Sequence, residues 1–129
     1  MKGYKYEIDG KEYTLCFTGE VFFDIDNIVG DKEIAEAIKP ETKEGFQKLC
    51  KTAALLSEQG ELVRRYLGYE PAETLDEDEL RKSISPSEMV DLYNAVLEAI
   101  ILGCKREIGD KTKEVSLTRQ KMLKKKELD

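Results

Sequence analysis

The residues of this chain best able to do chemistry are carboxylates, and four of them stand together at Asp76-Glu77-Asp78-Glu79. Oxygen ligands in such a cluster are the type that binds a hard divalent cation. Acidic residues in the first turn of a helix are also stabilised by the helix dipole, and this explains the run without a metal. We therefore expect no metal and no cofactor, and a metal-dependent enzyme that uses this acidic loop is the alternative.

Nucleophilic catalysis has little support in the sequence, which contains no histidine. A Ser–His–Asp or Cys–His arrangement therefore cannot form, and the usual zinc spacings are excluded because no Cys-x-x-Cys pair is present either. Cys16, Cys50 and Cys104 are far apart, and each falls on an apolar stripe, so we expect reduced core residues. A glycine-rich phosphate loop is also missing from the sequence. The residues therefore give no positive support for an enzyme and do not exclude one.

Charge is unevenly distributed along the chain. The net charge is −6, but residues 1–109 carry −9 and residues 110–129 carry +3. An acidic body is a poor binder of nucleic acid, since contacts with phosphate drive such binding. The longest apolar run covers residues 99–102, far short of the roughly 20 residues of a membrane-spanning helix. The N-terminus has no secretory pattern, so we expect a cytoplasmic protein without nucleic-acid or membrane partners.

The first 30 residues predict a β-hairpin followed by a capped helix. Residues 4–8 and 12–17 alternate apolar and polar side chains on either side of Asp9-Gly10, a pair that suits the positive φ angles of a type I′ turn. Thr18 stands at the N-cap of a helix predicted over 18–29, which Gly30 ends.

The middle of the chain is predicted to be helical, with glycine and proline at the breaks. The predicted helices cover residues 32–38 after a cap at Asp31, residues 41–59 up to Gly60, and residues 61–67 up to Gly68. Residues 68–85 are the most loop-like part, although the acidic run predicts a helical turn through residues 80–84.

The clearest helix start in the sequence is Ser85-Pro86-Ser87-Glu88, a capping box with proline at the first helical position. The helix that it opens is predicted to run to residue 107, and residues 110–129 contain too few large apolar side chains to form a core. We therefore predict an α+β fold that is mostly α. Its globular domain, residues 1–109, has an N-terminal β-hairpin packed on about five helices, and a flexible basic tail follows at 110–129.

Three stretches carry a family resemblance. They are the hairpin at residues 6–15 around Asp-Gly-Lys, the sequence Phe-Thr-Gly-Glu-Val-Phe-Phe-Asp-Ile at 17–25, and the long helix at 85–107 after an acidic loop. In this succession the chain resembles the tail assembly chaperones of long-tailed bacteriophages and prophages, especially those of Gram-positive hosts. The likeness covers residues 4–108.

The resemblance implies a non-enzymatic protein of the host cytoplasm that is absent from the mature virion. Such a chaperone binds the tape-measure protein and helps to recruit subunits of the tail-tube protein. Family members are often made in two forms through a −1 ribosomal frameshift, and Lys124-Lys125-Lys126 predicts an adenine-rich slippery sequence. The alternative is another phage structural protein, such as a head–tail connector or tail completion subunit.

Aromatic side chains are the candidate contacts with a partner, because they concentrate the energy of interfaces. The candidates are Phe22, Phe23, Tyr66, Tyr69 and Tyr93. Arg64-Arg65-Tyr66 would also suit base stacking, but Tyr66 continues an apolar face from Leu62, which favours core or interface packing. The apolar face of the 85–107 helix is wide enough to be compatible with a homo-oligomer as well.

Overall fold

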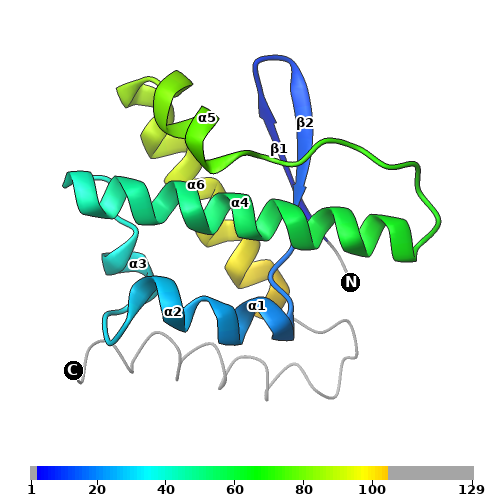
Figure 1. The fold of residues 1–129 in the computed structure, drawn as a ribbon, viewed down its shortest axis with the longest axis horizontal. Coiled ribbons are helices and arrows are strands. Elements are labelled where there is room, and N and C mark those ends of the chain that lie inside the picture. Colours follow the sequence, from blue (N-terminus) through cyan, green and yellow to red (C-terminus); the bar gives the residue numbers. More distant parts are fainter. Residues whose placement is uncertain (1–2, 105–129) are drawn as a thin grey trace.

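A β-hairpin opens the fold, as predicted. The computed structural model describes residues 3–104, and in it β1 (Tyr4–Ile8) and β2 (Lys11–Leu15) pair in antiparallel register, with Tyr4 opposite Leu15 (Figure 1). Asp9 and Gly10 have φ angles of 52° and 78°, so both central residues have the positive φ that a type I′ turn requires. The predictions for residues 105–129, including the basic tail and the last turn of the long helix, lie outside the described residues.

Three short helices follow the hairpin: α1 (Gly19–Asp24), α2 (Asp26–Val29) and α3 (Ile34–Ala37). The side chain of Thr18 accepts a hydrogen bond from the backbone N–H of Val21 at 3.3 Å, which confirms this residue as the N-cap. The single helix predicted over 18–29 is interrupted at Ile25. The prediction that Asp31 caps the next helix is wrong. The chain makes a turn at Asp31, and the N-cap of α3, with its extended backbone, is Glu33.

The central element is α4 (Lys43–Tyr66), a helix of 24 residues. The prediction that Gly60 ends a helix is wrong: α4 continues through it and joins the two helices predicted at 41–59 and 61–67. Gly60 is buried where β2 crosses the helix, and a Cβ built on it would collide with the carbonyl group of Thr14, 2.6 Å from the carbonyl carbon. This glycine therefore permits a close approach of strand and helix and has no role as a helix stop.

The end of α4 lies at the next glycine, where the sequence also places a stop. Gly68 has a φ of 92°. Its N–H donates to the carbonyl of Arg65 at 3.0 Å, and the N–H of Tyr69 donates to the carbonyl of Arg64 at 2.9 Å. These two bonds form a Schellman motif, which satisfies the last carbonyls of the helix.

Two capped helices complete the described chain, α5 (Glu77–Ser83) and α6 (Pro86–Cys104). The Asp76 carboxylate accepts from the N–H of Glu79 at 3.0 Å and so begins α5. At the start of α6, the N–H of Ser85 donates to the Glu88 carboxylate at 2.9 Å, and the N–H of Glu88 lies 3.4 Å from Ser85 Oγ. The predicted capping box is confirmed.

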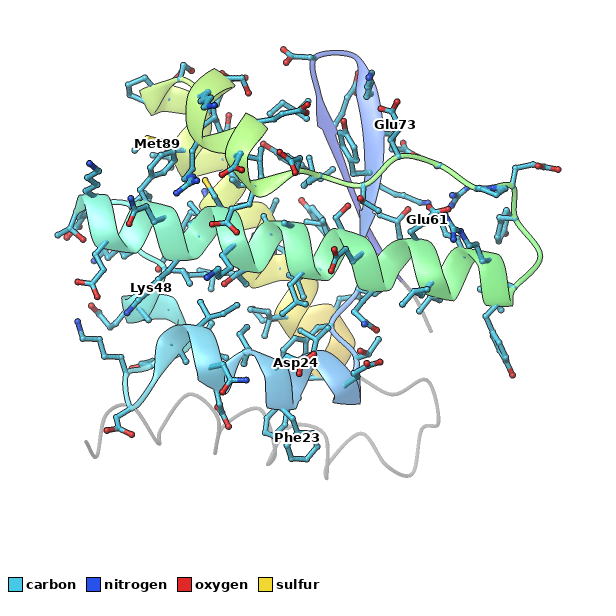
Figure 2. The ribbon with its side chains drawn as sticks, in the orientation of Figure 1. Phe23, Asp24, Lys48, Glu61, Glu73 and Met89 are labelled. Atoms are coloured by element: carbon cyan, nitrogen blue, oxygen red, sulfur yellow. The ribbon has the colours of Figure 1, made fainter. Side chains whose placement is uncertain are left out.

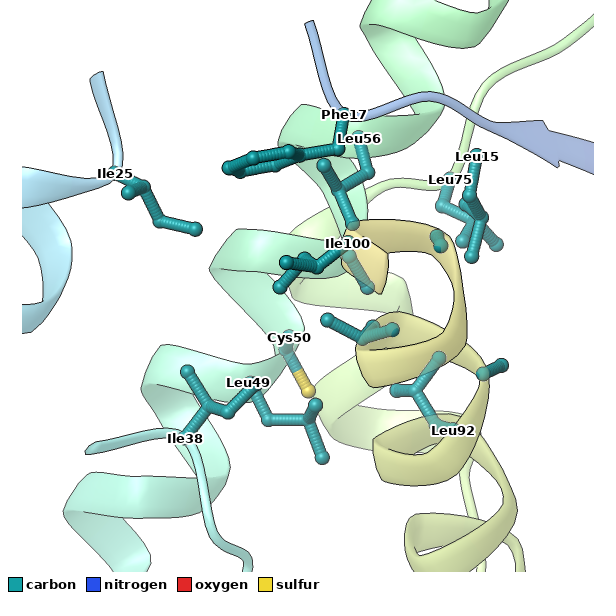
Figure 3. Close-up of a cluster of buried hydrophobic side chains, with 14 of the residues drawn as sticks. Leu15, Phe17, Ile25, Ile38, Leu49, Cys50, Leu56, Leu75, Leu92 and Ile100 are labelled. Carbon is teal, nitrogen blue, oxygen red and sulfur yellow. The ribbon is translucent and has the colours of Figure 1, made fainter. Parts of the chain in front are cut away.

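Most of these elements meet on α4, which packs against β2, α5 and α6 and also contacts α1, α2 and α3, whereas β1 packs on β2 and α6. Figure 3 shows the resulting core, to which β2, α4 and α6 contribute Leu15, Leu56 and Ile100. Cys16 and Cys50 are buried, as predicted, whereas Cys104 is only partly buried against the core. Burial raises the pKa of Cys50 to about 11. None of the helices in residues 3–104 has the length and apolar character to cross a membrane.

Candidate protein-interaction surface

The first group of exposed aromatic side chains lies on α1. Phe23 is 71% exposed and points away from the body of the protein (Figure 2), and its ring meets that of Phe22 edge to face at a centroid distance of 5.3 Å. Phe22 in turn contacts the buried ring of Phe17 at 6.2 Å. The pair therefore forms an apolar projection that is rooted in the core and ends in solvent.

The second group lies at the C-terminal end of α4. Tyr66 is 87% exposed, and Tyr69, Leu62 and Leu67 are exposed beside it. The guanidinium group of Arg64 lies over the ring of Tyr69 at 5.5 Å from its centroid, a cation–π contact that orients this tyrosine. Packing of Tyr66 into the core, one of the two predicted alternatives, is wrong, and packing at an interface stays a prediction.

Tyr93, the fifth candidate contact, is placed differently. It is half-buried on α6, and its hydroxyl donates to the carbonyl oxygen of Ala35 at 2.6 Å. Burial raises the pKa of this phenol, Lys39 acts in the opposite direction, and nearby carboxylates such as Glu36 add to the rise. Tyr93 thus ties α6 to α3, and the structure does not bring it together with the other four aromatic residues.

A buried carboxylate holds the loop that follows α4. Glu61 is only 6% exposed and accepts from Arg64 at 2.9 Å, from Arg65 at 3.2 Å and from the backbone N–H of Ala72 at 2.7 Å. Burial by itself raises the pKa of Glu61, but these hydrogen bonds and the two guanidinium groups together lower it.

The same loop is fastened at two further points. Ser57 Oγ accepts from the N–H of Leu75 at 2.9 Å, and Glu73 pairs with Lys11 of the hairpin at 2.9 Å (Figure 2). The loop therefore runs across α4 along a defined path.

This path leaves an open groove on α4, of about 430 Å³, between α1 and α2 on one side and the start of α5 on the other. We call it the α4 groove. Its apolar lining consists of Ile28, Ala54, Leu55 and Leu75, and its polar lining consists of Asp24, Asn27, Lys51, Glu58, Asp76 and Glu77. Among residues 3–104, four carboxylates and one lysine line the groove, which gives this part of the surface a negative character.

The acidic run that suggested a metal site has structural roles. Asp76 caps α5, and Asp78 forms an ion pair with Arg81 one turn later in that helix. Among residues 3–104, no three His, Cys, Asp or Glu side chains come together as metal ligands. In the structure, the acidic run forms the N-cap and the first turn of α5.

Sequence reasoning missed the α4 groove and the exposure of Leu62, Leu67 and Val90. The sequence does contain a signal for part of this exposed surface. Leu55, Leu62 and Tyr66 stand at spacings of seven and four residues, which place them on one face of a continuous helix. The predicted break at Gly60 hid this stripe, because it divided α4 between Leu55 and Leu62.

Comparisons with known proteins add no assignment, since no family model, no curated protein and no solved structure matches this chain.

Proposed function

We propose that this protein is a non-enzymatic phage tail assembly chaperone, which binds a tape-measure protein in the host cytoplasm and helps to recruit tail-tube subunits. The proposal starts from the resemblance in residues 4–108. The observation that carries it further is the exposed apolar stripe at the C-terminal end of α4, where Leu62 and Tyr66 lie in solvent beside an acidic groove.

A chaperone for a long helical client needs this combination of surfaces. Apolar side chains on such a client require a complementary apolar surface, whereas a charged surround keeps the chaperone itself soluble. The hairpin, α5 and α6 pack on the other faces of α4, and this packing supports a preorganised arrangement of its exposed residues. The rings of Phe22 and Phe23 on α1 offer a second apolar contact.

Co-expression with a long coiled-coil protein from the same genome, the candidate tape-measure protein, tests the proposal. We expect the two proteins to elute together in size-exclusion chromatography, and the coiled-coil protein to be insoluble alone. The double variant Leu62→Ser/Tyr66→Ser should reduce the soluble complex, whereas Val90→Ser, which changes an exposed apolar residue of α6, should not. Separate elution, with no change in the partner's solubility, would contradict the proposal.

Mass spectrometry of purified virions distinguishes the chaperone from a head–tail connector or tail completion subunit. A chaperone leaves the particle, so its peptides should be absent from virions and present in the lysate. Stoichiometric recovery from virions would favour the structural alternative.

A further inference from the structure

The outward face of α4 continues the α4 groove along the helix. Taking the direction of Leu55 as zero, the 100° rotation per residue places Lys51, Glu58, Leu62 and Tyr66 within about 60° of it. Leu55 lines the groove, and Leu62 and Tyr66 are exposed beyond it. From Lys51 to Tyr66 this face is about 22 Å long, the length of four helical turns.

The spacing along this face matches one kind of partner. Apolar residues at i, i+7 and i+11 form a straight seam on an α-helix, and the natural complement of such a seam is the apolar stripe of a second helix. A single loop or a compact small molecule would use only part of it.

The charges around the groove specify that partner further. Asp24 on α1, Glu58 on α4, and Asp76 and Glu77 at the start of α5 surround the apolar floor, and within residues 3–104 Lys51 is the one cation that lines it (Figure 2 shows Asp24 at the α1 border). An acidic helix would meet like charges here, whereas a basic one would place its lysines against carboxylates on both sides.

We propose that the α4 groove and the exposed face of α4 bind a basic amphipathic α-helix of the client protein. The proposal rests on the chaperone function, and it names the surface and the chemistry of the segment that the chaperone holds. Apolar side chains of the client helix pack on Leu55, Leu62 and Tyr66, and its lysines and arginines pair with Glu58 and Glu77.

The test uses the full chain and two fluorescein-labelled peptides of about 21 residues, enough to cover the face. Both carry leucine at positions a and d of three heptads. One has lysine at the exposed positions and the other has glutamate. In fluorescence anisotropy we expect the lysine peptide to bind roughly tenfold more tightly than the glutamate peptide, with an affinity that falls as salt is added.

Two pairs of variants locate the binding site. Leu62→Ser should weaken binding of the lysine peptide roughly fivefold or more, whereas Val90→Ser should leave it unchanged. Val90 is a matched control, because Leu62 and Val90 are 53% and 55% exposed. Glu58→Gln/Glu77→Gln should weaken binding more than Glu7→Gln/Glu98→Gln, which has the same net charge.

Equal binding of the two peptides, or equal effects of Leu62→Ser and Val90→Ser, would overturn the proposal. Two other occupants would overturn it as well. A dimer of the wild-type chain that Leu62→Ser converts to a monomer would assign the face to a second copy. Carbodiimide cross-links from Lys124, Lys125 or Lys126 to Glu58 or Glu77 of the same chain would assign it to the chain's own basic segment.

The peptide assay and the co-expression experiment can fail separately. Specific binding of the lysine peptide without a complex in co-expression would retain the helix-binding groove and refute the chaperone function. A stable complex that Leu62→Ser leaves intact would retain the chaperone and place its client elsewhere on the surface.

Discussion

Replacing Gly60 by alanine tests the crossing of β2 over α4. The added Cβ would lie 2.6 Å from the carbonyl carbon of Thr14 and 3.3 Å from its Cβ. Because the obstacle is main chain, it cannot rotate away, and the strand must move. Movement would strain the hydrogen bond from the N–H of Cys16 to the carbonyl of Leu56, 3.1 Å long, which fastens the end of β2 to α4.

The size of the effect follows from two opposing terms. Overpacking costs about 1–3 kcal/mol, and an immobile carbonyl places this site near 3 kcal/mol. Alanine gains about 1 kcal/mol over glycine inside a helix. We therefore expect a loss of about 2 kcal/mol in the free energy of unfolding. For a domain of this size that loss lowers Tm by about 8 °C.

Urea unfolding followed by circular dichroism at 222 nm measures this loss, and asparagine variants separate the two roles of glycine. At Gly60 asparagine should destabilise more than alanine, because it adds more atoms at the same crossing. At Gly68, whose φ is 92° and which has open space around it, asparagine should be tolerated better than alanine. Gly19→Ala, also in open space, should be within about 0.5 kcal/mol of wild type. A Gly60→Ala protein as stable as wild type would refute the close approach.

Three further predictions concern polar contacts. Ser85→Ala removes the cap of α6 and should cost about 1 kcal/mol in urea unfolding, whereas Ser85→Asp, which keeps a capping oxygen, should cost less. Tyr93→Phe removes the hydrogen bond to Ala35 and should cost about 1 kcal/mol in the same assay; an unchanged midpoint would show that the bond does not tie α6 to α3. The pKa of Glu61 is lowered in the folded protein, so its stabilisation is present above the unfolded value and is lost as pH falls through the folded value. Glu61→Gln should therefore destabilise at pH 7 and much less at pH 3, and an equal difference at both pH values would contradict the ion-pair role.

Local signals in the sequence predicted the ends of several elements well. Asp9-Gly10, Thr18, Gly68 and Ser85 each act through their own backbone or through a residue two or three positions away. Such contacts depend little on the rest of the fold, so the sequence pattern is sufficient to place them.

Gly60 and Gly68 show that the same local sequence signal can have two structural outcomes, because α4 continues through Gly60 and ends before Gly68. Both follow an apolar helical stripe, and glycine after such a stripe indicates a helix end. The deciding difference is a tertiary contact: β2 crosses α4 at Gly60, whereas a Cβ built on Gly68 would meet no atom of the described residues within 4 Å. Residues 46 positions apart make that contact, and no pattern in a single sequence records it.

The candidate surface could be predicted only in part, because tertiary contacts also decide which aromatic side chains are exposed. Adjacent phenylalanines on one helix cannot both enter the core, and Phe23 is indeed exposed. Tyr66 and Tyr93 both stand on apolar stripes of long helices, yet one lies in solvent and the other is half-buried against α3. Only the arrangement of the helices decides which stripe is covered.

The central position of α4 has a consequence for how the chain folds. Its partners lie on both sides of it in the sequence: β2 and α1 to α3 are synthesised before it, and α5 and α6 after it. A nascent chain that ends at Tyr66 leaves the side of α4 that packs on α6 exposed to water. The core therefore closes only after α6 has left the ribosome. In native-state hydrogen exchange, the buried turns of α4 should open only when the whole domain unfolds, while the hairpin turn at Asp9-Gly10 exchanges through local motions.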